Sequence, residues 1–302
     1  MSADVEWTNN EASRSKAAIA SLNYVSDPFV GLFCRESPLK RTPEINRGYY
    51  GRCRAVNHVI DQFCQRETSR AQIVNIGCGF DALYWRLCRE SREFCRVVDV
   101  DTNQVIAEKV HTIDKCPELS RLLDDKSDRK GVCLHSSRYH AFGSDATKGR
   151  QLIHRLTTDC SVKTTDPILF VFECVLLYWT RDQTQTLVRT LATGFPSATF
   201  VVFDVIGKGD AFCHVMRESL SLRETPLLGS ETTLEDWKQT FLSNSCLHVK
   251  AWDMRTVYQQ LLDSKDRQRA ESLEFLDETE LLEQLLQHYC LVVASNYWAV
   301  QW

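Results

Sequence analysis

IVNIGCGFD, residues 73–81, is the stretch that decides the fold of this chain. It begins with a short apolar run that can form a buried strand, and it continues with Gly77 and Gly79 on either side of a cysteine. Glycines at the end of a strand allow a tight turn and let a ligand come close to the backbone. With Ala82 the turn satisfies the dinucleotide-binding pattern G-x-G-x-x-G/A. Taken alone this is a weak indication, because a tight turn without a ligand gives the same letters.

Short apolar runs alternate with helical segments after this turn, and helices are expected at about 81–93 and 102–115. Continuous apolar runs are typical of strands that helices cover on both faces. We therefore expect an α/β fold with a doubly wound, Rossmann-like sheet. The runs are QIVNI at 72–76, RVVDVD at 96–101, PILFVF at 167–172 and ATFVVFDVI at 198–206.

The two ends of the chain look different from this core. Residues from about 10 to 66 are expected to form a helical extension, so we divide the chain into an extension at 1–66 and a core with inserted helices at 67–302. Near the C-terminus the sequence predicts a helix at 234–242, a helical segment over 272–289 and a final strand at 290–300. The acids of DETE in that segment either cap a helix or lie on the exposed face of a longer one.

Composition excludes several classes of protein. The formal net charge is −4 and no basic run occurs, so nucleic acid is not an expected partner. The N-terminus does not resemble a secretory signal, and no apolar stretch reaches the roughly 18 to 20 residues that span a membrane. We expect a cytoplasmic monomer, with access to the nucleus left open. The 13 cysteines and eight histidines lack closely spaced pairs, which predicts free thiols and no zinc site.

Acidic residues occur where a ribose-containing ligand needs hydrogen-bond acceptors. Asp99 and Asp101 share one face of the second strand, and Asp101 is favoured because the last residue of a strand lies nearest the ligand crevice. Asp99 is expected to support the loop. Asp145 follows a short segment in mid-chain, and Glu173 ends an apolar strand, where an unpaired carboxylate is costly. NAD and S-adenosylmethionine both fit this pattern, and each acid can instead cap nearby backbone.

Longer strings of the sequence are more specific than the glycine turn. They are TPEINRGYYGR, IVNIGCGFDALYWRL, VVDVD, GSDAT, FECVLLYW and ESLEFLDETELLEQLLQHYC. Together they resemble the leucine carboxyl methyltransferase family, which methylates the C-terminal leucine of the catalytic subunit of protein phosphatase 2A. The resemblance extends from about residue 16 to residue 290 and decides against a dehydrogenase. It implies an S-adenosylmethionine-dependent enzyme whose partner is the C-terminal tail of that subunit.

The resemblance also assigns residues to the cofactor. Lys16 and Arg52 would engage the carboxylate of its methionine part, and Glu173 would lie beside the aminoacyl end. Two positions depart from the family. Cys78 stands in the glycine turn where a small, alanine-like residue is expected, and Ala146 stands where leucine is usual, which leaves less apolar surface against the adenine.

The remaining cofactor residues follow from the same resemblance. Gly77 and Gly79 would line the cofactor, Asp101 would hold the ribose, and Asp145 and Ala146 would lie beside the adenine. A relative of the family methylates a carboxyl group on tRNA wybutosine and carries a repeat domain after its core. Since this chain ends without such repeats, we expect the phosphatase to be the substrate, with a different protein or a tRNA as the alternative.

The chemistry implied needs positioning more than proton transfer. A C-terminal carboxylate has a pKa of about 3.3 to 3.7, so it is already the nucleophilic anion at neutral pH. Arg52, with Arg47 five residues earlier, offers planar donors for carboxylates, and Tyr178 offers a hydroxyl near the reacting groups. Arg52 and Tyr178 are thus the catalytic candidates, although such side chains are more often solvated or in the core. A catalytically silent phosphatase-binding protein would have lost a ligand acid, whereas all the acids are present.

Overall fold

The described part of the chain folds around one mixed β-sheet. The computed structural model describes residues 3–34, 36–123, 128–130, 133–207, 209–221, 227–229 and 232–301. Its strands are β1 (Gln72–Ile76), β2 (Arg96–Asp101), β3 (Asp128–Lys130), β4 (Cys133–His135), β5 (Tyr139–Gly143), β6 (Ile168–Glu173), β7 (Ala198–Val205), β8 (His248–Asp253) and β9 (Tyr289–Ser295). Among these residues the strand order is β3-β4-β5-β2-β1-β6-β7-β9-β8. The central five strands, from β5 to β7, run parallel, and both flanks are antiparallel.

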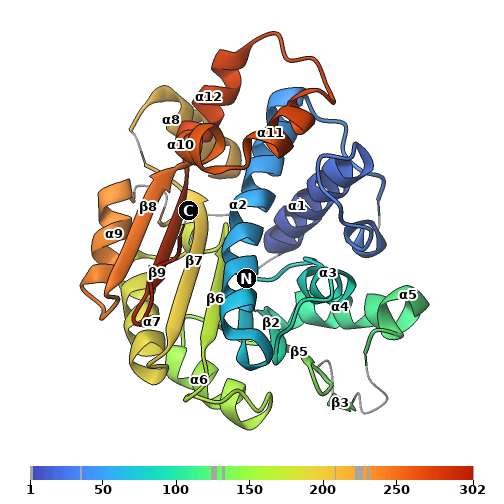
Figure 1. The fold of residues 1–302 in the computed structure, drawn as a ribbon, viewed down its shortest axis with the longest axis vertical. Helices are drawn as coiled ribbons and strands as arrows, with labels where there is room; N and C mark the ends of the chain where they lie inside the picture. Colours follow the sequence, from blue (N-terminus) through green and yellow to red (C-terminus); the bar gives the residue numbers. More distant parts are fainter. Residues whose placement is uncertain are drawn as a thin grey trace.

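Helices cover both faces of this sheet, as Figure 1 shows. The longer ones are α1 (Ala3–Ser21), α2 (Pro43–Glu67), α3 (Leu83–Arg89), α4 (Asn103–Lys115), α6 (Gly149–Thr158), α7 (Arg181–Gly194), α8 (Ala211–Ser221), α9 (Leu234–Leu242), α11 (Ser264–Glu271) and α12 (Thr279–Gln287). Short helical turns are η1 (Val30–Phe33), η2 (Thr68–Arg70), α5 (Pro117–Ser120), η3 (Leu176–Tyr178), α10 (Met254–Thr256) and η4 (Val257–Leu261). One core layer joins the sheet to α2, α3 and α4, and the other joins it to α6, α7 and α9. The predicted doubly wound α/β fold is confirmed.

The strands predicted from apolar runs are β1, β2, β6 and β7 in the centre of the sheet and the final strand, β9, which covers Tyr289–Ser295 of the expected 290–300. All of β1 and β7 is buried, because helices lie on both sides of them. The sequence analysis missed β3, β4, β5 and β8. Three of these have five residues or fewer, and β8 is an edge strand whose side chains are exposed or half-buried. Such strands lack the apolar run on which the prediction depended.

Three predicted helices have different limits. α1 already begins at Ala3, and α3 covers only Leu83–Arg89 of the expected 81–93, because the glycine turn continues to Ala82, the N-cap. In the C-terminal segment only Thr279–Gln287 is helical, so the prediction over 272–289 was too long. The N-cap of α12 is Glu278, and its side chain makes no capping bond. Asp277 precedes the helix, whereas Glu280 is exposed in its first turn, so the exposed role is found for Glu280 alone.

The helical extension packs directly on the sheet. In Figure 1, α2 crosses in front of the middle of the sheet and α1 lies beside it. Buried side chains of α2, among them Val59 and Phe63, belong to the same apolar cluster as β1 and β7. The division between residues 66 and 67 therefore stays a prediction about organisation. All 13 cysteines are free thiols, as predicted, and among the described helices none has the length and apolar character needed to cross a membrane.

A buried ion pair fixes α4 against the sheet. Lys109 is fully buried, and its Nζ lies 2.6 Å from Oδ2 of Asp99 on β2. The same Asp99 oxygen accepts a hydrogen bond from the hydroxyl of Tyr139 at 2.7 Å. Lys109 also donates to the carbonyl of Asp81 at 2.8 Å. Asp99 thus supports the loop after β1 through Lys109, in agreement with the role predicted for it.

Replacement of Lys109 by alanine is expected to lower the free energy of unfolding by about 3 to 5 kcal/mol, because it leaves a buried carboxylate without its cation. Lys115→Ala, at an exposed position of the same helix, is expected to change it by less than about 0.5 kcal/mol. Urea unfolding of both variants measures the difference. Equal midpoints for the two variants would contradict a stabilising role of the pair.

Candidate functional site

The glycine turn lies at the carboxyl end of β1, where the backbone needs conformations that other residues avoid. Gly77 has φ +67° and Gly79 has φ +50°. A Cβ on Gly77 would lie 2.4 Å from a methyl carbon of Val175, and one on Gly79 would lie 2.6 Å from Oδ1 of Asn9 on α1. Both glycines are therefore required by sterics as well as by φ. The Cys78 thiol between them is buried.

Asp101 fastens the glycine turn to β2. Its Oδ2 accepts the amide of Gly79 at 2.8 Å, and its Oδ1 accepts the amide of Thr102 at 2.7 Å. Burial raises the pKa of Asp101, and these backbone bonds oppose that effect. A carboxylate has about four acceptor positions, so two remain for hydroxyl groups of a ligand. The location at the end of β2 agrees with the choice of Asp101 over Asp99 for a ribose.

Glu173, the last residue of β6, receives two cations from the helical extension. Nζ of Lys16 on α1 lies 2.8 Å from Oε1 of Glu173, and Nε of Arg52 on α2 lies 2.5 Å from the same oxygen. Burial alone would raise the pKa of Glu173, but Lys16 and Arg52 outweigh it and hold the pKa below its ordinary value. The structure therefore brings together three residues that lie far apart in the sequence and were each assigned to the aminoacyl end of the cofactor.

Asp81 is a member of this cluster that the sequence analysis did not assign. Its Oδ2 lies 2.6 Å from Nζ of Lys16, and its Oδ1 lies 3.3 Å from Nη2 of Arg86. Arg86 in turn contacts Asp27, with Nε 3.2 Å from Oδ2. Burial would raise the pKa of Asp81, but Lys16 and Arg86 lower it far below its ordinary value. Its place directly after the glycine turn was the signal that could have identified it.

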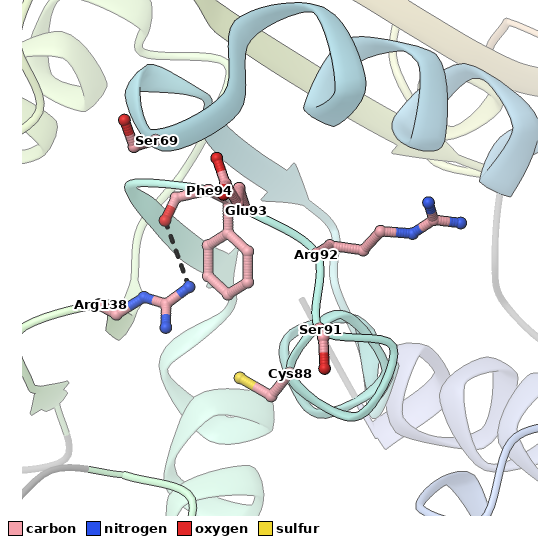
Figure 2. Close-up of a pocket in the computed structure, with 7 residues that line it drawn as sticks. All are labelled: Ser69, Cys88, Ser91, Arg92, Glu93, Phe94 and Arg138. Carbon is pink, nitrogen blue, oxygen red and sulfur yellow. Dashed lines mark hydrogen bonds between the residues drawn. The ribbon is translucent and has the colours of Figure 1, made fainter.

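The cluster borders a small cavity of about 80 Å³ whose lining includes Lys16, Asp27, Cys53, Asp81, Arg86 and Glu173. Pockets for small organic ligands have about 300 to 1,000 Å³. The cavity is smaller because the charged side chains pair across it. A larger pocket of about 350 Å³, shown in Figure 2, lies at the opposite, amino edge of the sheet, where Ser69 precedes β1, Phe94 precedes β2 and Arg138 precedes β5. Since ligands of such sheets bind at the carboxyl edge, the small cavity marks the site.

The other predicted site residues have different surroundings. Asp145 is exposed after β5 and accepts the amide and hydroxyl of Thr147, while Ala146 is buried against the core. Tyr178 is half-buried at the end of η3. Among the residues that the structure describes, no carboxylate pairs with the guanidinium of Arg47. Arg47 donates to the carbonyls of residues 271 and 274 and so holds the loop after α11.

Two groups of potential metal ligands gather in the described part of the chain. They are His135 with His140 and Cys160, and Asp210 with Cys213 and His288. In the first group, Nδ1 of His135 lies 3.1 Å from Nδ1 of His140. In the second group, Nε2 of His288 lies 2.8 Å from Oδ2 of Asp210. The ligands come from different elements, so an argument from close sequence spacing missed them. That the protein uses no metal stays a prediction.

The charged residues fit the amino acid end of S-adenosylmethionine. That end carries a carboxylate and an ammonium group, and the cluster offers two partly buried cations, Lys16 and Arg52, next to two partly buried anions, Glu173 and Asp81. Each ligand charge can thus replace one partner of an existing pair. Gly77 and Gly79 carry no Cβ, which lets Val175 and Asn9 approach the turn closely.

A model of the leucine carboxyl methyltransferase family matches residues 9–192, more than half of the chain and the part that contains all of these groups. The chain belongs to this family. Leucine carboxyl methyltransferase 1 of Bos taurus is 36% identical over 299 residues, which are 97% of this chain and 90% of that protein. The homologue of Arabidopsis thaliana is 32% identical with the same coverage. The tRNA wybutosine-synthesizing protein 4 of Homo sapiens is 32% identical, over 97% of this chain and 44% of its own length.

Solved structures support the fold of this family member. A protein of Thermobifida fusca assigned to the methyltransferases superposes with a TM-score of 0.57 and 12% identity, covering 84% of this chain and 83% of that one. A protein of Streptomyces avermitilis gives a TM-score of 0.55 at the same identity. The fold is that of the Rossmann-like, S-adenosylmethionine-dependent methyltransferases, and the predicted family and enzyme class are confirmed.

Gly77→Ala is expected to lower the free energy of unfolding by about 2 to 4 kcal/mol. An alanine is strained at φ +67°, and its Cβ would displace the side chain of Val175. Gly31→Ala is the matched control, since a Cβ there meets no atom within 4 Å. It is expected to change stability by no more than about 0.5 kcal/mol. Thermal unfolding of both variants is the measurement, and a stable Gly77→Ala protein would contradict the steric role given to this glycine.

Proposed function

We propose that the protein uses S-adenosylmethionine to methylate the α-carboxylate of the C-terminal leucine of the protein phosphatase 2A catalytic subunit, which gives a methyl ester. The observation that carries this proposal is the partly buried cluster of Lys16, Arg52 and Glu173 beside the glycine turn, in a chain of the leucine carboxyl methyltransferase family. Paired charges of both signs suit an amino acid zwitterion. The relatives whose name includes leucine carboxyl methylation are matched over nine-tenths of their length.

Residues of this chain would hold the cofactor along the carboxyl edge of the sheet. Lys16 and Arg52 would bind its carboxylate and Glu173 its ammonium group. Asp101 would accept hydrogen bonds from the ribose, and Asp145 and Ala146 would lie beside the adenine. When bound, S-adenosylmethionine supplies an electrophilic methyl group on its sulfonium sulfur.

The protein need only position the acceptor. A free C-terminal carboxylate has a pKa of about 3.3 to 3.7 and is the anion at neutral pH, so no base has to remove a proton. Holding the reacting groups in line and excluding water can lower the barrier by several kcal/mol. Arg52 would neutralise carboxylate charge, and the Tyr178 hydroxyl would orient the acceptor oxygen. These two roles make Arg52 and Tyr178 the catalytic residues of the proposal.

The helical extension would close the site on the acceptor side. α1 brings Lys16 and α2 brings Arg52 over the carboxyl edge, so both helices would lie next to the reacting end of a bound tail. We propose a monomer that acts in the cytoplasm, and also in the nucleus. A second candidate substrate is a carboxyl group on tRNA, because the wybutosine-synthesizing relatives are matched at 32 to 33% identity. The net charge of −4 favours a protein over a nucleic acid.

The first test is a calorimetric titration with S-adenosylmethionine and with NAD. We expect binding of S-adenosylmethionine only, since the paired charges at Glu173 suit an amino acid end. Lys16→Met is expected to weaken this binding by about tenfold or more, from the loss of a charged hydrogen bond. Lys40→Met, at an exposed position, should leave it unchanged. Tighter binding of NAD would overturn the assignment.

The second test concerns the acceptor, and it measures base-labile methyl incorporation from labelled cofactor. We expect labelling of the intact catalytic subunit and none of its C-terminally amidated form, which has no carboxylate anion. The isolated tail peptide is expected to react much more slowly than the intact subunit, because remote contacts help to position the reacting end.

Two further acceptors separate the alternatives. A subunit without its last leucine should not be labelled, and equal labelling would contradict leucine specificity. Labelling of the amidated form would contradict carboxyl chemistry. If only wybutosine-precursor tRNA accepts the methyl group, the second candidate substrate is the correct one.

A further inference from the structure

The turn after β6 has an unusual backbone conformation. Cys174, which directly follows Glu173, has φ +58°. For a residue with a Cβ this left-handed conformation costs about 1 to 2 kcal/mol, and it persists where the surrounding structure imposes it. The amide of Cys174 still donates to the carbonyl of Phe203 on β7 at 2.7 Å. The chain then leaves the sheet abruptly and forms η3.

A buried carboxylate on the neighbouring strand holds this turn. Oδ2 of Asp204 accepts the amides of Leu176 at 2.9 Å and Leu177 at 3.2 Å. Its Oδ1 accepts the amide of Val205 at 2.8 Å. Asp204 is 0% exposed, in a strand whose other residues are apolar except for one threonine. The hydrogen bonds from these three backbone amides thus compensate for the loss of hydration of the buried Asp204 carboxylate.

The same turn carries three groups of the site. Glu173 at its start binds Lys16 and Arg52. Val175 packs against Gly77, where a Cβ would meet it at 2.4 Å. Tyr178 at its end is the proposed acceptor-orienting hydroxyl. A shift of the turn would therefore move the cation cluster, the glycine turn and the tyrosine together.

We propose that Asp204 is a positioning residue, whose carboxylate fixes the turn of residues 173–178 in the geometry that methyl transfer requires. This inference rests on the proposed function, since it assigns the turn a role in that reaction. A carboxylate can accept from all three amides, whereas an asparagine would face one of them with its own N–H groups. The charge at this buried position is retained for geometry, at a cost in stability.

The protonation state of Asp204 gives the inference a measurable pH dependence. Burial raises the pKa of Asp204 to about 7, against the lowering effect of its backbone bonds and of Arg52 on α2. The other titratable groups facing it are Cys174 in the turn and Tyr289 and Cys290 on β9. Because the folded-state pKa is raised, the folded protein binds the extra proton between about pH 4 and pH 7, and stability falls as pH rises through that window. The ordered turn and the activity are expected to increase over the upper part of the same window.

The experiment compares Asp204→Asn with the wild-type protein. Amide hydrogen exchange of Leu176 and Leu177, corrected for its intrinsic pH dependence, is expected to be about tenfold faster or more in the variant. At pH 8, kcat is expected to fall about tenfold or more. The dissociation constant of S-adenosylmethionine is expected to rise as well, because the displaced turn carries Glu173 of the cofactor site. In the wild-type protein, kcat and the protection of both amides should decline together as pH is lowered through about 7. This decline should be absent from the variant.

Matched variants keep the test decisive. Asp253→Asn is the control, because Asp253 also accepts a backbone amide, that of Thr256, and pairs with the same Cys290 of β9 from its other side. It should leave exchange at the turn and kcat unchanged. Asp204→Glu keeps a carboxylate and is expected to restore part of both readouts. If Asp204→Asn does not fold, this variant and the wild-type pH titration carry the test.

The results separate this inference from the proposed function. Wild-type kcat and pH profile in Asp204→Asn would overturn the positioning role, and so would faster exchange without any loss of kcat. If the wild-type protein methylates none of the acceptors, the proposed function fails. The exchange of the Leu176 and Leu177 amides then still decides whether Asp204 orders the turn, since it needs no substrate.

Discussion

The structure depends on one electrostatic constraint, the need to pair buried charges at the carboxyl edge of the sheet. Glu173 ends β6 and Asp81 lies in the loop after the neighbouring β1, where each would cost several kcal/mol if it were unpaired. Lys16 from α1 and Arg52 from α2 supply the compensating charges. The pairing thus fastens both helices of the extension over the edge of the sheet that binds ligands. The extension belongs to the site for a physical reason, and not only because it precedes the core in sequence.

Further polar side chains hydrogen-bond to the backbone of the loops next to this charged cluster and hold these loops in place. Asp101 holds the amide of Gly79, and Lys109 connects Asp99 to the carbonyl of Asp81. On the other side, Asp204 holds the turn that follows Glu173. Buried acids near the ends of β2 and β7 therefore orient loops at the carboxyl edge of the sheet, where Glu173 ends β6. Such a set of fixed dipoles and charges suits a reaction whose rate depends on alignment more than on proton transfer.

Sequence patterns predicted four of the five central strands and β9, and they missed β5 and the strands at both edges of the sheet. The central strands are buried on both faces, so their apolar runs are continuous and easy to recognise. β5 and β8 are short or partly exposed, and they pair where their neighbours place them. The segment 272–289 has a helical pattern, yet its first part is a loop held by buried Arg47. A tertiary contact there overrode the local preference.

The sequence by itself determined the family, the glycine turn, and the site residues that end a predicted strand, such as Asp101 and Glu173. These follow from letters that are close together in the chain. Only the tertiary structure decided that Lys16, Arg52, Asp81 and Glu173 share one cluster, and that Asp204 supports the turn beside it. Those residues come from segments separated by tens to more than a hundred positions. Their pairing depends on how the sheet brings strand ends together and on the energetic cost of an unpaired charge away from water. Neither can be predicted from the spacing of residues that are close in the sequence.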